Sequence, residues 1–282
     1  MNSLEAPPLT ARRAVAPASV SDVLTHETIG SVAVLTLNRP AARNSLSEAL
    51  IAALHGALAS VRDDARVRAV VIAANGTVFS SGHDLKELSA RRSDPDRGRA
   101  YFAQMMTACS AMMQAIVHLP KPVIAAVQGV ATAAGCQLVA SCDLAVASEQ
   151  ASFATPGVDI GLFCSTPMVA LSRNVPRKHA MHMLMTGEPV SAPRAVELGL
   201  INSVVTPGTE RDAAIALANR IAAKSAHTVK IGKEAFYRQA EMPLAEAYRY
   251  AAAVMTENIL ARDAEEGINA FIEKRDPHWE DR

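Results

Sequence analysis

Apolar residues along this chain recur with two spacings, one typical of β-strands and one typical of α-helices. Residues 31–38 alternate apolar and polar side chains, and residues 67–73, VRAVVIA, are mostly apolar, so both segments are predicted strands. Between them, Leu50, Leu54 and Leu58 recur every four positions and predict a helix with one apolar face.

The stretch from Lys121 to Asp143 carries no charge between its ends and changes character halfway along. It begins as an apolar strand, is interrupted at Gln128 and Gly129, and becomes helical from about Ala134. A membrane helix is not expected because polar and small residues interrupt the run. A packed turn remains possible, but a helix start also offers free N–H groups and a positive dipole end to a carbonyl oxygen that gains negative charge.

Methionines mark one face of a further predicted helix, over residues 98–118. Met105, Met106, Met112 and Met113 lie at helical spacing. Such a face belongs either to the core or to the wall of an acyl pocket, and periodicity does not separate the two.

Two other regions are predicted from their composition and periodicity. The polar, charged segment 86–99 is expected to be mobile. After Glu210 the pattern is helical to the end, with predicted helices over residues 210–224, 226–239, 243–261 and 263–273.

The composition limits the possible partners. Half of the 282 residues are hydrophobic, as expected for an α/β protein, and the formal net charge is zero. No nucleic acid or membrane partner is therefore expected. The four cysteines lack metal-ligand spacing, which predicts buried thiols in a reducing compartment and no metal site.

The N-terminal residues 1–21 are predicted to form a disordered tail. Arg12 and Arg13 give a faint similarity to a transit peptide, but Glu5 and the lack of an amphipathic face argue against one. The expected location is the cytoplasm, or mitochondria if the source is eukaryotic.

The central stretch resembles a known family signature. Residues 128–138, QGVATAAGCQL, followed by Cys142 and Asp143, resemble the Asn-Gly-x-Ala-x-Gly-Gly-Gly motif of the crotonase (enoyl-CoA hydratase/isomerase) superfamily. Three further strings, GHDLKEL, FATPG and GLFCSTP, resemble the branch of enoyl-CoA hydratase domain-containing protein 3. The resemblance covers about residues 24–275.

The resemblance implies a fold and a class of substrate. The expected fold is the α/β crotonase (ClpP-like) spiral of ββα turns, with an acyl-CoA groove in residues 22–207 and a C-terminal α-helical trimerisation region in residues 208–282. The expected protein is a homotrimer or hexamer that processes acyl-CoA thioesters of fatty acid metabolism as a lyase or isomerase. Coenzyme A would enter as part of the substrate, with no other cofactor.

The resemblance also implies which residues form the site. Backbone N–H groups of His83 and Ala134 would form an oxyanion hole for a thioester enolate, and losing one such donor typically raises the barrier by roughly 3 to 4 kcal/mol. Arg43 would face the coenzyme A phosphates, unless it is simply a solvated loop arginine. The substrate-binding residues implied in this way are Arg43, His83, Asp84, Leu85, Lys86 and Ala134. The side chains of Asp84 and Glu87 are themselves explained by a predicted capping box.

The sequence departs from the family where proton transfer is expected. Gln137 and Gly157 occupy the positions of the two hydratase glutamates, and neither residue exchanges a proton near neutral pH. Ordinary hydratase activity is therefore not expected. The imidazole of His83 has a pKa suited to acid–base work, although a histidine lining a polar wall is the commoner case. Cys164 and Asp159 are weaker substitutes, as is the neighbouring Ser165.

Three hypotheses follow from these departures. The first is an acyl-CoA enzyme that stabilises an enolate through His83 and Ala134 and transfers protons in a non-standard way. The second is a catalytically weak or inactive acyl-CoA-binding pseudoenzyme. The third, an enzyme of this fold for a substrate without coenzyme A, is disfavoured by the retained Asp84, Lys86 and the loop at residues 38–44.

Overall fold

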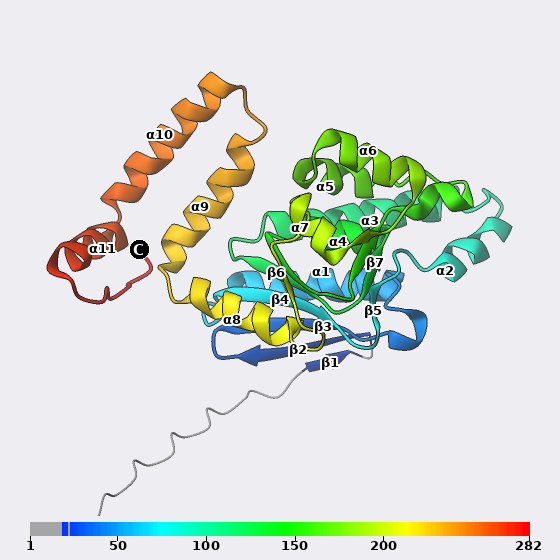
Figure 1. The fold of residues 1–282 in the computed structure, drawn as a ribbon, viewed down its shortest axis with the longest axis horizontal. Coiled ribbons are helices and arrows are strands. Elements are labelled where there is room, and N and C mark those ends of the chain that lie inside the picture. Colours follow the sequence, from blue (N-terminus) through cyan, green and yellow to red (C-terminus); the bar gives the residue numbers. More distant parts are fainter. Residues whose placement is uncertain (1–18, 22) are drawn as a thin grey trace, which may run out of the picture.

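A large sheet forms the centre of the molecule (Figure 1). Within residues 19–21 and 23–282, which the computed structural model describes, this sheet has seven strands. In spatial order they are β1 (Ser19–Ser21), β2 (Leu24–Ile29), β3 (Val32–Leu37), β4 (Ala69–Ala74), β6 (Val123–Val127), β8 (Leu144–Ser148) and β11 (Ser203–Val205). From β3 onward the neighbouring strands are parallel, so the chain must cross over between them.

A smaller sheet lies beside the first one. Its strands, in spatial order, are β10 (Val190–Ser191), β9 (Ser152–Ala154), β7 (Val130–Thr132) and β5 (Val78–Ser80). β5 follows β4 in the chain, β7 follows β6, and β9 follows β8. Each turn of the chain therefore places one strand in each sheet, which is the repeating turn of the predicted spiral.

Helices cover both faces of the large sheet (Figure 1). Their bounds are α1 (Glu48–Asp63), α2 (Leu85–Ala90), α3 (Arg99–Val117), α4 (Ala134–Ser141), α5 (Pro167–Asn174), α6 (Arg177–Thr186), α7 (Ala192–Glu197), α8 (Glu210–Ala222), α9 (Ala226–Gln239), α10 (Leu244–Leu260) and α11 (Arg262–Glu273), with short 3₁₀ helices η1 (Pro40–Ala42), η2 (Arg91–Ser93) and η3 (Pro156–Ile160). On one face, Ala214 and Ala218 of α8 pack against Val34 and Val71. The main core fills the other face, beneath α1, α3 and α4.

Most of the predicted elements are present with nearly the predicted bounds. Met112 and Met113 of α3 are buried in the main core, as the core interpretation of the methionines predicts, and Met105 is buried there as well. The uncharged central run divides into β6, β7 and α4, and no helix in the described ranges has the length and apolar character to span a bilayer. The segment 86–99 contains α2 and η2.

The predicted N-terminal tail is described only at its end. Residues 19–21 form β1, and residues 1–18 and 22 lie outside the described part of the chain. The division into a core and a helical region at residue 208 stays a prediction.

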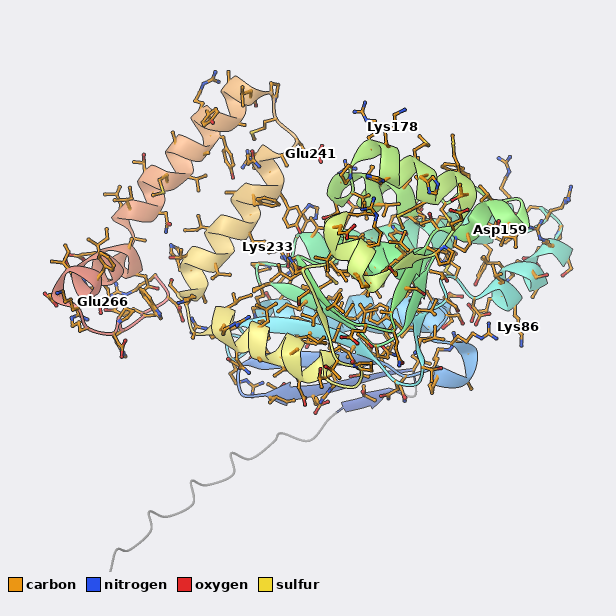
Figure 2. The ribbon with its side chains drawn as sticks, in the orientation of Figure 1. Lys86, Asp159, Lys178, Lys233, Glu241 and Glu266 are labelled. Carbon is orange, nitrogen blue, oxygen red and sulfur yellow. The ribbon has the colours of Figure 1, made fainter. Side chains whose placement is uncertain are left out.

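The last three helices stand away from the sheets (Figure 1). α9 meets the core at a buried ion pair, in which the Nζ of Lys233 lies 2.7 Å from a carboxylate oxygen of Asp143. Tyr237 donates to the other oxygen of this carboxylate at 2.9 Å, and Lys233 also donates to the carbonyls of Ile116 and Lys121, both at 3.0 Å. Figure 2 shows Lys233 between α9 and the rest of the fold.

Candidate functional site

The junction between β5 and α2 holds the first predicted site residue. The N–H of Leu46 donates to the carbonyl of Gly82 at 2.7 Å, and the N–H of Asp84 donates to the carbonyl of Leu46 at 3.3 Å. His83 lies between these two bonds, so its own N–H points away from Leu46. That N–H has no hydrogen-bond partner among the described residues.

An ion pair fixes this junction from the neighbouring loop. Arg39 lies 3.0 Å from a carboxylate oxygen of Asp84, and Ser45 donates its hydroxyl to the same oxygen at 3.0 Å. Burial raises the pKa of Asp84, but the hydrogen bonds from Arg39 and Ser45 outweigh burial and leave the pKa below its usual value. Sequence reasoning missed Arg39, although it lies in the loop that was singled out.

The predicted capping box is only half correct. Asp84 caps α2 by accepting the N–H of Lys86 at 3.1 Å. Glu87, however, does not bond back to Asp84, because its carboxylate accepts the N–H of Glu48 at 3.0 Å. The box fails because the Asp84 N–H is already bonded to Leu46, and Glu87 instead joins α2 to the start of α1.

The predicted basic contacts lie at the surface beside this junction. Arg43 is exposed, its backbone has a positive φ of 54°, and its carbonyl accepts the N–H of Ser81 at 3.1 Å. Leu85 and Lys86 are exposed on α2. Figure 2 shows Lys86 and Asp159 on the same side of the molecule. These side chains are therefore accessible to a ligand that approaches His83.

The junction between β7 and α4 holds the second predicted site residue. Ala134 is the first residue of α4 and is not among the residues with positive φ, so alanine fits this position without backbone strain. The N–H of Ala134 has no hydrogen-bond partner in the described part of the chain. The unusual backbone belongs to Ala133, with φ 51° and ψ −119°, a conformation that favours glycine.

The two junctions touch each other. A Cβ added to Gly82 would lie 2.8 Å from the Cβ of Ala133 and 3.2 Å from the nitrogen of Ala134. A Cβ added to Gly135 would lie only 2.3 Å from the carbonyl oxygen of Ser80. The two glycines therefore allow the chain segments that carry His83 and Ala134 to lie side by side.

The positions of the two missing glutamates differ in how much space they have. Gln137 is 5% exposed on α4, and its Oε1 has no hydrogen-bond partner among the described residues. Gly157 is buried in η3, where a Cβ would lie 2.7 Å from the carbonyl oxygen of Leu162 and 2.9 Å from the Sγ of Cys164. A glutamate at position 157 would therefore require the following loop to move.

The remaining candidate groups differ in burial and in hydrogen bonding. Burial lowers the pKa of His83, with a smaller opposing effect of the Leu46 backbone, and neither ring nitrogen has a hydrogen-bond partner of normal geometry among the described residues. Burial raises the pKa of Cys164, so this cysteine is a thiol. Asp159 and Ser165 are exposed, and Ser165 donates its hydroxyl to the carbonyl of Phe163.

A further buried polar residue was missed by sequence reasoning. Thr155 is fully buried between β9 and η3, and its hydroxyl has no hydrogen-bond partner in the described ranges. The N–H of Ala133 donates to the carbonyl of Ala154 at 2.9 Å, which places Thr155 next to the start of α4. Only its position just before Pro156 could have drawn attention to it.

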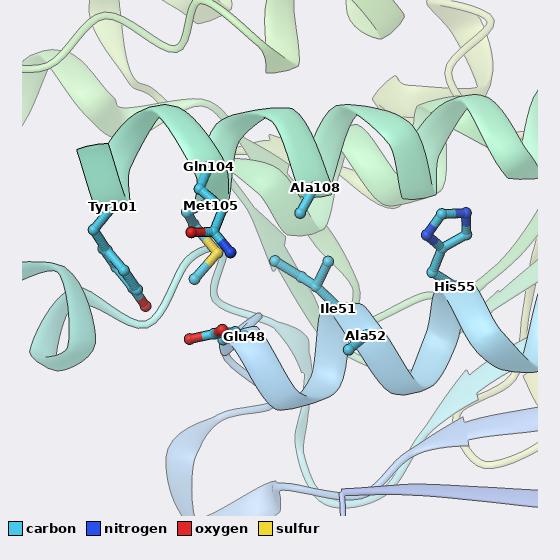
Figure 3. Close-up of a pocket in the computed structure, with 8 residues that line it drawn as sticks. All are labelled: Glu48, Ile51, Ala52, His55, Tyr101, Gln104, Met105 and Ala108. Atoms are coloured by element: carbon cyan, nitrogen blue, oxygen red, sulfur yellow. The ribbon is translucent and has the colours of Figure 1, made fainter. Parts of the chain in front are cut away.

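A separate cavity of about 230 Å³ lies between α1 and α3 (Figure 3). Glu48 and Tyr101 stand at one end and His55 at the other, with Ile51 and Met105 among the residues between them. Met105, one of the methionines considered for the wall of an acyl pocket, lines this cavity, whereas none of the predicted catalytic and substrate-binding residues does. The chemistry expected at His83 and Ala134 therefore does not involve it.

Comparison with known proteins identifies the family. A family model for enoyl-CoA hydratase/isomerase matches residues 27–282. The chain belongs to the enoyl-CoA hydratase/isomerase family. Among relatives, human enoyl-CoA hydratase domain-containing protein 3, mitochondrial, is 47% identical over 245 residues, which are 87% of this chain and 79% of that protein. A probable enoyl-CoA hydratase of Rhizobium meliloti is 33% identical over 93% of this chain and 99% of its own length.

Solved structures of this enoyl-CoA hydratase/isomerase family have the same fold. The crystal structure of an enoyl-CoA hydratase from Mycobacterium smegmatis is 50% identical and matches with a TM-score of 0.87, covering 92% of this chain and 99% of that one. Human enoyl-CoA hydratase domain-containing protein 3 is 46% identical and matches with a TM-score of 0.86, covering 91% and 100%. The predicted crotonase fold and the predicted branch are thus confirmed.

Proposed function

We propose that this chain binds an acyl-CoA thioester and stabilises its enolate form with the N–H groups of His83 and Ala134. The contact between the two junctions supports this proposal, because neither N–H group has a hydrogen-bond partner among the described residues and Gly82 lies against the nitrogen of Ala134. The N-terminal end of α4 adds a partial positive charge beside the same point. Membership of the enoyl-CoA hydratase/isomerase family supports the choice of a thioester.

The exposed cations Arg43 and Lys86 are proposed to meet the coenzyme A phosphates, and Asp84 and Leu85 are proposed to belong to the same substrate-binding segment. Coenzyme A enters only as part of the substrate. The apolar side chains exposed on α10 and α11 are proposed to form the interface of a homotrimer or hexamer; they are Leu244, Tyr248, Met255, Ile259, Leu260, Ile268, Phe271 and Ile272. A cytoplasmic or, in a eukaryote, mitochondrial location remains a prediction; the curated relatives from rat and human carry "mitochondrial" in their names.

The proposed enzyme, a lyase or isomerase, does not add water in the ordinary way. Gln137 cannot exchange a proton, and Gly157 has no space for a carboxylate. His83 supplies one of the proposed backbone donors and also has a titratable side chain. Burial lowers the pKa of this imidazole and so favours its neutral form, which can accept a proton. The lack of space for a carboxylate at Gly157 is also what an acyl-CoA-binding pseudoenzyme would show, and this is the alternative function.

A substitution at the start of α4 tests the proposed oxyanion hole. Proline is well tolerated at the first position of a helix, so Ala134→Pro removes the N–H, whereas Ala134→Gly retains it as the matched control. The ligand is a cinnamoyl-CoA chromophore, whose absorption shifts to longer wavelength when its carbonyl is polarised. We expect the shift with the wild type and with Ala134→Gly, and its loss with a natively folded Ala134→Pro.

Two results would refute the proposal: no binding of the chromophore by the wild type, or an unchanged shift in Ala134→Pro. Circular dichroism checks that each variant is folded. Turnover of crotonyl-CoA by the wild type adds a second readout. Binding without consumption fits a pseudoenzyme or an enzyme for another acyl-CoA, whereas rapid hydration would contradict the interpretation of Gln137 and Gly157. In an enzyme, loss of one oxyanion donor should lower kcat about 100- to 1,000-fold.

A further inference from the structure

A polar cavity of about 430 Å³ lies at the carboxyl ends of β3, β4 and β6, beside the start of α8. In open α/β sheets, ligands commonly bind outside the carboxyl ends of the strands. The cavity is separate from the proposed oxyanion hole. Neither His83 nor Ala134 lines it, and Ala134 packs in the main core, on the other face of the large sheet from α8.

The sequence forms the floor of this cavity where the rows of core residues end. Val34 and Val71 pack against α8, whereas the next residues on the same face, Thr36 and Ala73, are paired across β3 and β4 and line the cavity. Thr25 of β2 is paired with Thr36 on the other side, and side chains paired in this way share one face of the sheet. Two threonines therefore lie side by side on the cavity floor.

Three oxygen atoms that face this cavity lack partners. Thr36 is 7% exposed, and its hydroxyl forms no hydrogen bond within the described part of the chain. Gln128 donates its Nε2 to the carbonyl of Gly76 at 3.1 Å, but its Oε1 is buried with no partner among the described residues.

Glu210 carries the third such oxygen. The residue is 8% exposed, and its Oε2 accepts the N–H of Gly208 at 2.9 Å. Its Oε1 accepts no hydrogen bond from the residues that the structure describes. Most buried polar groups in proteins are paired, so three unpaired oxygens around one cavity indicate a polar ligand that the chain itself does not supply.

The charges around the cavity select the kind of ligand. Arg211 forms an ion pair with Glu27 at the outer rim, so the carboxylate of Glu210 leaves the cavity with one net negative charge. The Oε1 atoms of Gln128 and Glu210 only accept hydrogen bonds, and a threonine hydroxyl can also accept one. The missing partner is therefore a cation that donates hydrogen bonds. A primary ammonium group supplies one positive charge and three N–H donors.

Other ligands fit the lining less well. An anion would meet the uncompensated carboxylate of Glu210. A quaternary ammonium has no N–H donor and is usually held by aromatic rings, which are absent from the described residues that line the cavity. The described ranges contain no group of three His, Cys, Asp or Glu side chains that could hold a metal ion.

We propose that this cavity binds a small primary amine in its ammonium form, with Thr36, Gln128 and Glu210 as hydrogen-bond acceptors. The site is distinct from the proposed acyl-CoA site and lies on the other face of the large sheet. This inference does not depend on the proposed function, so either one can fail without the other.

The test is a ligand-observed NMR titration of the full chain with 1-aminobutane, butan-1-ol and butyltrimethylammonium at neutral pH. We expect the wild type to bind 1-aminobutane at least about tenfold more tightly than the other two, because hydrogen bonds to a charged group contribute most. Thr36→Val and Glu210→Gln should each weaken amine binding about tenfold. Thr28→Val is the matched control, because Thr28 of β2 points to the opposite face from Thr25 and does not line the cavity.

Three results would overturn the inference. The first is equal affinity for the amine and the alcohol, and the second is equal affinity for the amine and the quaternary ammonium. The third is amine binding that is absent at millimolar concentration or unchanged in both Thr36→Val and Glu210→Gln. Urea unfolding checks that each variant is folded. Thr36→Val keeps the size of the side chain, so it provides the test even if Glu210→Gln disturbs the start of α8.

Discussion

Replacing Lys233 by methionine should strongly destabilise the protein, because it breaks the buried ion pair that joins α9 to the core. The side chains of Lys233 and Asp143 are 8% and 15% exposed. Burial acts against both charges, so it raises the pKa of Asp143 and lowers that of Lys233, while their mutual attraction opposes both shifts. The pair persists because further hydrogen bonds from Val123 and Tyr237 satisfy the carboxylate.

The structure sets the size of the effect. Within the described residues, Lys233→Met leaves the buried Asp143 carboxylate with only the bonds from Val123 and Tyr237. It also leaves the carbonyls of Ile116 and Lys121 without the ammonium donor. Removing one partner of a buried ion pair costs about 3–5 kcal/mol, since the remaining charge is uncompensated. We therefore expect the free energy of unfolding to fall by about 4 kcal/mol.

Urea unfolding followed by circular dichroism measures this change at one fixed protein concentration, because subunit association would also affect stability. Lys230→Met is the matched control, since Lys230 lies exposed on the same helix. The double variant Lys233→Met with Asp143→Leu removes both charges and should recover part of the loss. A Lys233→Met protein within 1 kcal/mol of the Lys230→Met control would refute the reasoning.

Three further predictions concern the site. Ala133→Gly should raise the unfolding free energy by up to about 1–2 kcal/mol in urea unfolding, because glycine adopts the positive φ of Ala133 without strain; a loss of stability would contradict this. Arg39→Met should lower it by about 2 kcal/mol, since Asp84 loses a charged hydrogen bond, and an unchanged urea midpoint would argue against that role. Since burial lowers the pKa of His83 in the folded state, the unfolded state binds this proton more readily. Stability should therefore be full above about pH 6.5 and fall below it, and His83→Gln should lessen the fall between pH 7.5 and 5.5; equal slopes would exclude His83 as a cause.

The strands β3, β4 and β6 of the large sheet were predicted from sequence, whereas β1, β2 and the small sheet were not. β3 and β4 are six residues each, long enough to show an apolar pattern. β5, β7 and β9 are three residues each, and no periodicity is visible over that length. α5 was not predicted either; it is a short helix of eight residues that begins at Pro167.

In the site, features set by neighbouring residues could be predicted, whereas contacts between distant segments could not. The start of α4 at Ala134 follows from neighbouring residues, and the structure places it there. The support from Arg39 to Asp84 spans 45 positions, and the burial of Thr155 depends on segments that meet only in the folded chain. No local pattern carries that information, so Arg39 and Thr155 were found only in three dimensions.

The close contact at Gly135 sets a limit on how far this motif can diverge. The signature that the chain resembles has three consecutive glycines, where this chain has Ala133, Ala134 and Gly135. Ala134 has a helical backbone, so alanine causes no strain there. Ala133 has a positive φ, so alanine is tolerated there with backbone strain. A side chain at Gly135 would instead collide with the backbone of Ser80, which cannot move without shifting β5 and the His83 junction. Two of the three glycines are thus open to sequence drift, while the third is held in place by the position of a different strand.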